Sequence, residues 1–189
     1  MQSLIRNLQK NPVIPAARTL DGAKRAAQTE AAAIFLLGGS ILTIPEMIQI
    51  THDCGKRAFV HLDLAEGLGR DEVAVRWCVA VHGADGVIST RPSLLKAASE
   101  MGALTIQRLF LMDSSSFEHG KKMLRNTPPD MAEVLPGIAP KAIRQMCEAL
   151  NKPVIAGGLI TEEREIALAI EAGAAAVSVG DERLWDVKL

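Results

Sequence analysis

Two glycine-bearing segments near the end of the chain have the composition of a phosphate-binding site. One apolar run leads into Gly157 and Gly158, and a second apolar run, which contains Ser178, leads into Gly180. Glycine lets backbone N–H groups approach an anion, because no Cβ stands in the way. A helical pattern follows Gly158, and the positive end of a helix attracts an anion further. The alternative is that these glycines only make tight turns between strands and helices.

Polar side chains also interrupt or end other apolar runs of the chain. One run alternates so that His61 and Asp63 share a face, and two later runs contain Arg108 and Glu133, the second of which leads into Gly137. A charged group on an apolar strand is costly unless it faces water, a partner or a ligand. These residues therefore join the glycines as candidate ligand-binding residues.

Each candidate also has a structural explanation that the sequence leaves open. His61 could be an interior histidine that is paired with Asp63 or Glu133, and Asp63 could only cap a loop. Arg108 could serve to neutralise Glu133 as part of the scaffold. Alternation along the strand does not decide whether Gln107 or Arg108 points inward.

A divalent metal is a weaker hypothesis for the same residues. His61, Asp63, Glu66 and Glu133 offer one imidazole and three carboxylates, which could fill an octahedral site. The chain has no His-x-His or Cys-x-x-Cys pair, however. We expect no metal, no cofactor and no catalytic residue, and a small phosphate ester as the ligand.

Eight short apolar runs alternate with helical patterns along the chain. Because the runs are apolar on both faces and separated by helices, they predict a parallel sheet. Eight such units predict one compact α/β domain over residues 1–189, a TIM-type (β/α)8 barrel with short loops, and a doubly wound open sheet is the alternative. The predicted strands are 13–16, 33–37, 58–63, 86–90, 104–111, 132–135, 153–156 and 175–179.

Several residues predict where the helices begin and end. Thr43-x-x-Glu46 has the form of a capping box, and Pro140 suits the first turn of a helix. Three glycines follow apolar helical stretches and are expected to end them, namely Gly55, Gly102 and Gly173.

The composition limits the possible partners and the cellular compartment. Lys and Arg number 21 against 22 Asp and Glu, so no overall positive field attracts a nucleic acid or a membrane. Local basic clusters could contact phosphates, although each could also be a solvated helix face: Arg6 and Lys10; Lys24 and Arg25; Lys121, Lys122 and Arg125. Aromatic residues make up only 3% and Tyr is absent, so no base-stacking platform is visible. No segment reads as a membrane span.

The three cysteines also bear on the compartment. Cys54, Cys78 and Cys147 are widely spaced and odd in number, and each lies in a helical pattern. We expect free, buried thiols in a reducing cytoplasm.

These residues also carry a resemblance that extends from about Pro12 to Gly180. Blocks in the same order are similar to the glycerol-3-phosphate-responsive antiterminator family: His61-x-Asp63-Leu64-x-x-Gly67-Leu68; Asp71-Glu72-x-Ala74; Gly86-Val87-Ile88-Ser89-Thr90; Thr105-Ile106-Gln107-Arg108-x-Phe110-Leu111-x-Asp113-Ser114; Glu133-x-Leu135-Pro136-Gly137; Ile155-Ala156-Gly157-Gly158-Leu159-Ile160. The resemblance implies a compact TIM-type barrel that regulates glycerol-uptake operons. It also implies action on leader mRNA, which prevents premature termination when glycerol 3-phosphate is present.

The resemblance implies roles for the candidate residues as well. Gly157, Gly158, Ser178 and Gly180 would hold the phosphate, and a second group would surround the glycerol hydroxyls, namely His61, Asp63, Arg108 and Glu133. Such proteins commonly carry consecutive small hydroxyl residues at the end of the last strand, whereas Val179 and Gly180 follow Ser178 here. Regulation could further require a homodimer that joins two weak RNA-binding patches.

An enzyme that acts on a phosphosugar is the competing function. An isomerase, epimerase or aldolase could use His61 as a general acid or base on the same scaffold. No lysine lies within a predicted strand to form a Schiff base, and no nucleophile and base form an obvious pair.

The glycine-bearing loop 64–69 lies beside Asp63. We expect this loop to order over the barrel mouth when the ligand binds.

Overall fold

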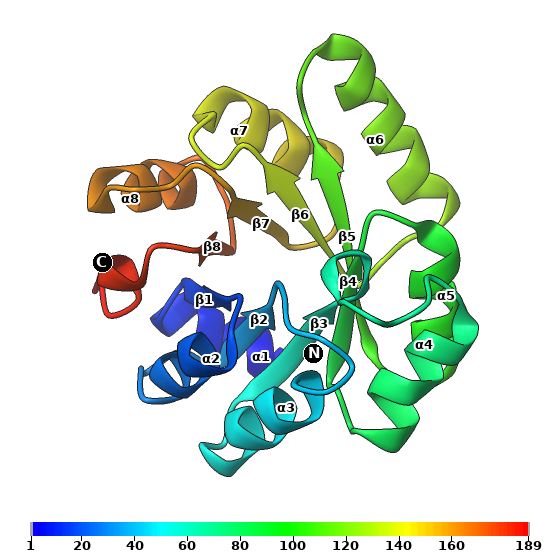
Figure 1. The fold of residues 1–189 in the computed structure, drawn as a ribbon. Helices are drawn as coiled ribbons and strands as arrows, with labels where there is room; N and C mark the ends of the chain where they lie inside the picture. Colours follow the sequence, from blue (N-terminus) through cyan, green and yellow to red (C-terminus); the bar gives the residue numbers. More distant parts are fainter. Residues whose placement is uncertain (1, 189) are drawn as a thin grey trace.

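The computed structural model describes residues 2–188, in which eight parallel strands close into a barrel in the order of the chain (Figure 1). The predicted TIM-type fold is confirmed, and the open doubly wound sheet is wrong because β1 pairs with both β2 and β8. The strands are β1 (Val13–Ala17), β2 (Ala33–Leu36), β3 (Arg57–His61), β4 (Gly86–Ser89), β5 (Leu104–Phe110), β6 (Met131–Leu135), β7 (Val154–Gly157) and β8 (Ala176–Val179).

Helices follow the first seven strands, whereas within residues 2–188 β8 is followed only by a short 3-10 turn, Glu182–Leu184. One further helix, α1, precedes β1. With 189 residues the chain is shorter than the roughly 250 residues that are typical of such barrels. The helices are α1 (Gln2–Lys10), α2 (Leu20–Ala27), α3 (Ile44–Asp53), α4 (Glu72–Arg76, continued by a π-helical turn), α5 (Pro92–Glu100), α6 (Ser114–Asn126), α7 (Pro140–Ala149) and α8 (Glu163–Glu171).

An apolar cluster fills the barrel interior at the N-terminal ends of the strands. Phe35, Phe59 and Ile106 belong to it, and so do Leu4 and Leu8 of α1. Helix α1 therefore closes the N-terminal end of the barrel and leaves the carboxyl ends of the strands as the open mouth, where barrel proteins carry their sites.

The helix-end predictions are confirmed with one exception. Gly55, Gly102 and Gly173 have φ values of 71°, 80° and 104°, the left-handed conformation expected just after a helix. Pro140 begins α7. The capping box at Thr43 is wrong: this residue has a helical ψ of −28°, and its Oγ1 accepts the N–H of Ser40 instead of capping α3.

The cysteines are free, but they are not all buried. Cys78 is buried and Cys147 is half-buried, whereas Cys54 is exposed. The expectation was wrong for Cys54 because this residue lies at the C-terminal cap of α3, beyond the face that packs on the barrel. No helix among residues 2–188 is long and apolar enough to cross a bilayer.

Candidate functional site

The inward-facing residues of the strands change from apolar to polar at the barrel mouth. On β5, Ile106 lies in the apolar cluster, so Arg108, two residues further on, also faces inward. On β6 and β3 the same spacing places Glu133 above Met131 and His61 above Phe59. A buried polar layer thus lies directly above the apolar interior.

Arg108, Glu133 and Ser178 form the centre of this layer. Arg108 and Glu133 are register partners on β5 and β6, and Arg108 Nε lies 3.1 Å from Glu133 Oε2 without hydrogen-bond alignment. Ser178 Oγ donates to Glu133 Oε1 at 2.6 Å. Glu133 is completely buried and Arg108 is 9% exposed. Burial raises the pKa of Glu133, and the charge of Arg108 and the bond from Ser178 oppose that shift.

Gly157 makes room for this arrangement. An ideal Cβ at Gly157 would lie 2.4 Å from Ser178 Oγ and 2.7 Å from Glu133 Oε1. Glycine is therefore required at position 157 by the contact between Ser178 and Glu133, whereas the sequence suggested either a phosphate site or a tight turn there.

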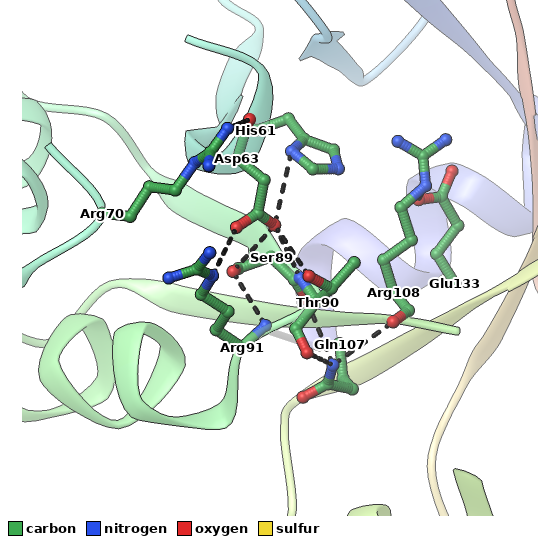
Figure 2. Close-up of polar contacts among 9 residues, drawn as sticks. All are labelled: His61, Asp63, Arg70, Ser89, Thr90, Arg91, Gln107, Arg108 and Glu133. Atoms are coloured by element: carbon green, nitrogen blue, oxygen red, sulfur yellow. Dashed lines mark hydrogen bonds and ion pairs between the residues drawn. The ribbon is translucent and has the colours of Figure 1, made fainter. Parts of the chain in front are cut away.

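His61 is a buried imidazole at the edge of the same layer. It is 2% exposed, and its Nδ1 lies 3.8 Å from Asp63 Oδ2, again without hydrogen-bond alignment (Figure 2). Burial and the charge of Arg108 lower the pKa of His61 to about 4, against the opposing effect of Asp63. The imidazole is therefore neutral at pH 7 and can donate from one nitrogen and accept at the other.

Asp63 reaches its position by a route different from the one predicted. Strand β3 ends at His61, and Leu62–Leu64 form a 3-10 turn that directs the carboxylate toward β4. There Asp63 Oδ2 accepts from Ser89 Oγ at 3.0 Å, from the Thr90 N–H at 2.7 Å and from Thr90 Oγ1 at 3.3 Å (Figure 2). Asp63 is thus a cap on the end of β4.

Gln107 points to the outer side of β5, so Arg108, and not Gln107, faces the interior of the barrel. Its Nε2 donates to the carbonyl oxygens of Ser89 and Thr90 at 3.2 and 2.9 Å. These two bonds are a second link between β5 and the end of β4, which was not predicted from the sequence. The signal available in the sequence was a glutamine between two strongly apolar positions, Ile106 and Leu109, of the predicted strand.

The glycine segments after β7 and β8 expose part of their backbone. Gly158 and Leu159 adopt left-handed φ values of 82° and 64°. No protein acceptor within residues 2–188 receives the N–H of Leu159 or of Gly180. An ideal Cβ at Gly180 would meet nothing within 4 Å, so the space beside it is open.

The start of α8 does not assist in the way that the sequence predicted. Glu165 Oε2 already accepts the N–H groups of Thr161 and Glu162, at 2.7 and 3.1 Å. The first turn of α8 is also acidic, with Glu163 and Glu165. Carboxylates of the chain itself therefore occupy the positive end of this helix.

The amide of Gly137 is used internally. It donates to the carbonyl oxygen of Gly158 at 3.0 Å, and a Cβ at Gly137 would lie 2.6 Å from Ile160 Cδ1. Gly137 thus ties the loop after β6 to the loop after β7. No group of three or more His, Cys, Asp or Glu side chains within residues 2–188 is arranged to hold a metal ion.

The sequence of this chain is similar to a known family and to a protein of Escherichia coli. The family model described as "Glycerol-3-phosphate responsive antiterminator" matches residues 13–185. The uncharacterized protein YgcP of Escherichia coli is 39% identical over 182 residues, which cover 96% of this chain and 95% of that protein.

Solved structures give the same result. The glycerol uptake operon antiterminator regulatory protein of Listeria monocytogenes is 32% identical, with a TM-score of 0.88 over 93% of this chain and 95% of that one. An antiterminator-related protein of Thermotoga maritima, also 32% identical, has a TM-score of 0.79 over 92% and 96%. An N-acetylmannosamine-6-phosphate 2-epimerase from Clostridium perfringens, at 16% identity, shares the fold alone. The chain belongs to the family of glycerol-3-phosphate-responsive antiterminators.

Proposed function

We propose that this chain binds glycerol 3-phosphate in the barrel mouth and, in that state, acts on leader mRNA to allow transcription of glycerol-uptake genes. The observation that carries the proposal is the buried set of Arg108, Glu133 and Ser178 beside the open backbone at Gly180. Family membership supplies the class of ligand and of regulation. Such a regulator would work in the cytoplasm, where transcripts are made.

The two ends of the ligand call for different groups. The phosphate requires positive charge and N–H donors, which Arg108, Leu159 and Gly180 provide. The hydroxyl groups require buried acceptors and donors, and Glu133 Oε2 and His61 Nδ1 are both buried without a hydrogen-bond partner. Asp63 would then position His61 and the end of β4.

The surroundings of Gly180 limit where the phosphate can lie. Hydrogen bonds from Arg183 lower the pKa of Asp181 to about 2, so this carboxylate is charged at neutral pH. Glu165 is bound at the start of α8. Because both carboxylates repel a dianion, we expect Arg108 to carry most of the phosphate attraction.

Binding without turnover fits these residues better than phosphosugar chemistry does. The eight strands contain no lysine, so none of them supplies a Schiff-base amine to the mouth. Asp63, a potential carboxylate partner for His61, is already engaged by Ser89 and Thr90. Incubation with triose, pentose and hexose phosphates should therefore give no product, and sustained turnover of any of them would favour the enzyme.

Titration calorimetry tests the ligand directly. Glycerol 3-phosphate should bind, whereas glycerol and inorganic phosphate at the same concentrations should bind far more weakly, because each engages only half of the site. Arg108→Gln combined with Glu133→Gln removes both buried charges together and should weaken binding about 10- to 100-fold. Arg76→Gln on α4, an exposed residue paired with Glu72, serves as the control.

The RNA half of the proposal needs its own measurement. Filter binding of an in vitro transcript of the glycerol-uptake leader should show tighter binding when glycerol 3-phosphate is present. Sedimentation of the same mixtures would show whether a homodimer forms, as the family resemblance suggested. Binding of ligand together with an RNA affinity that ligand does not change would contradict the regulatory function.

A further inference from the structure

We propose that the exposed face of α6 is the surface that contacts the phosphate backbone of the RNA. The inference rests on the proposed function and adds to it the place where the partner binds. We define the α6 face by its exposed basic side chains, His119, Lys122 and Arg125, together with Lys121 at its edge.

The structure separates two of the basic clusters that the sequence left equivalent, those on α2 and on α6. Arg25 is paired with Glu182, and Lys24 lies 4.0 Å from Asp21, so carboxylates neutralise that cluster. On α6, by contrast, no carboxylate in residues 2–188 lies within 4.0 Å of Lys122 or Arg125. These two cations remain free to pair with phosphates.

Lys121 joins the α6 face to a neighbouring cleft. Its Nζ lies 2.7 Å from Glu118 and 5.2 Å from the centre of the Phe117 ring. The cleft between α6 and α7, about 730 Å³ in volume, is lined by Lys121 and Lys141 and also by three carboxylate residues, Asp113, Glu118 and Glu148. The free positive charge is therefore confined to α6 and ends at Lys121.

Helix α6 is attached to the barrel along a narrow strip. Only Gly120 and Leu124 of its 13 residues are buried, and Figure 1 shows the helix on the outer side of β5. A second hollow of about 520 Å³ is lined by residues of α6 alone, among them Glu118, His119, Lys122 and Arg125. The outward side of the helix is thus open to a large partner.

The chemistry of this face favours a sugar–phosphate backbone over bases. The α6 face offers mainly charged groups. Its one imidazole, His119, is the only ring that it exposes among the described residues, and the neighbouring Phe117 ring is half-buried under Lys121. Charged contacts of this kind give affinity that depends on salt and little on sequence.

Strand β5 links the α6 face to the barrel mouth. Arg108 faces into the mouth, and the adjacent Leu109 packs on α6, where an ideal Cβ at Gly120 would lie 3.2 Å from Leu109 Cδ1. Asp113, five residues after Arg108, caps α6 by accepting the N–H of Ser116 at 2.7 Å. A ligand that engages Arg108 thus acts on the strand that carries the proposed RNA surface.

Charge reversal on two helices tests the location. Lys122→Glu with Arg125→Glu should weaken binding of the leader transcript at least tenfold at 0.1 M salt. The slope of log affinity against log salt should become smaller by about 2. The matched control is Arg6→Glu with Lys10→Glu on α1, where both residues are exposed and belong to a different helix, the one that closes the N-terminal end of the barrel. This control should change the affinity less than twofold.

The outcomes separate this inference from the function on which it rests. If the unaltered chain does not bind the transcript, the proposed function fails. If it binds and the α6 variant binds equally well, or if the α1 variant loses affinity instead, the location is wrong. Calorimetry with glycerol 3-phosphate and thermal unfolding of both variants should match the unaltered chain, which shows that the charge reversal acts on RNA contact alone.

Discussion

Ser178 and Glu133 share a hydrogen bond of 2.6 Å although their strands, β8 and β6, are not neighbours in the barrel. The bond crosses β7 at Gly157. Because Gly157 has no Cβ, the side chains of Ser178 and Glu133 can meet there. One buried polar contact thus joins three consecutive strands. The same contact positions the Glu133 carboxylate beside Arg108.

A methyl group at Gly157 should break this contact. Gly157→Ala would place a Cβ 2.4 Å from Ser178 Oγ, so we expect a loss of about 1–3 kcal/mol in the free energy of unfolding, measured by urea titration. Gly180→Ala is the matched control, because its Cβ would meet nothing within 4 Å. Equal losses in the two variants would show that the contact with Ser178 is not the cause.

Removal of the Glu133 carboxylate should lower the free energy of unfolding more than Gly157→Ala does. Glu133→Ala leaves Arg108 buried without its partner, and we expect about 3–5 kcal/mol less stability. Glu133→Gln keeps an acceptor for Ser178 and should lose less. A Glu133→Ala variant as stable as the unaltered chain would mean that the Arg108 pair contributes nothing.

The raised pKa of Glu133 predicts the direction of a pH effect. The folded chain holds this proton at a higher pH than the unfolded chain does, so stability should fall as the pH rises from the unfolded pKa of about 4.5 to the raised folded value. Glu133→Gln should remove this component, which unfolding curves of both proteins between pH 4 and 8 would reveal.

Much of the fold followed from the sequence, because each strand is apolar on both faces and ends near a polar residue or glycine. The inward direction of Arg108 was open, since alternation fixes a face only when one residue is already known to lie inside, as Ile106 now is. The Glu133–Ser178 bond and the role of Gly157 were beyond the sequence. They depend on the order of the strands, which sets β6, β7 and β8 side by side and brings together residues 45 positions apart.

His61 predicts a pH effect of the opposite sign. Its pKa is about 4 in the folded chain and about 6.5 in the unfolded chain, so the unfolded chain binds more protons between these values. Stability should therefore rise from pH 4 to 6.5, by about 3 kcal/mol from this group, and then level off. His61→Asn should flatten that rise in urea titrations, and an NMR titration of the imidazole should give a midpoint near 4. A midpoint near 6.5 would contradict the burial argument.

The loop 64–69 should respond to the ligand. Two backbone hydrogen bonds already hold it against the loop after β2: the Ile41 N–H donates to Glu66 O at 2.8 Å, and the Glu66 N–H donates to Gly39 O at 2.9 Å. Both loops border the mouth, and Asp63 at the base of this loop contacts His61. Glycerol 3-phosphate bound near His61 should therefore slow hydrogen exchange at the amides of Ile41 and Glu66. The exposed amides of α2 provide an internal control, and equal exchange with and without ligand at saturating concentration would show that this loop does not close over the site.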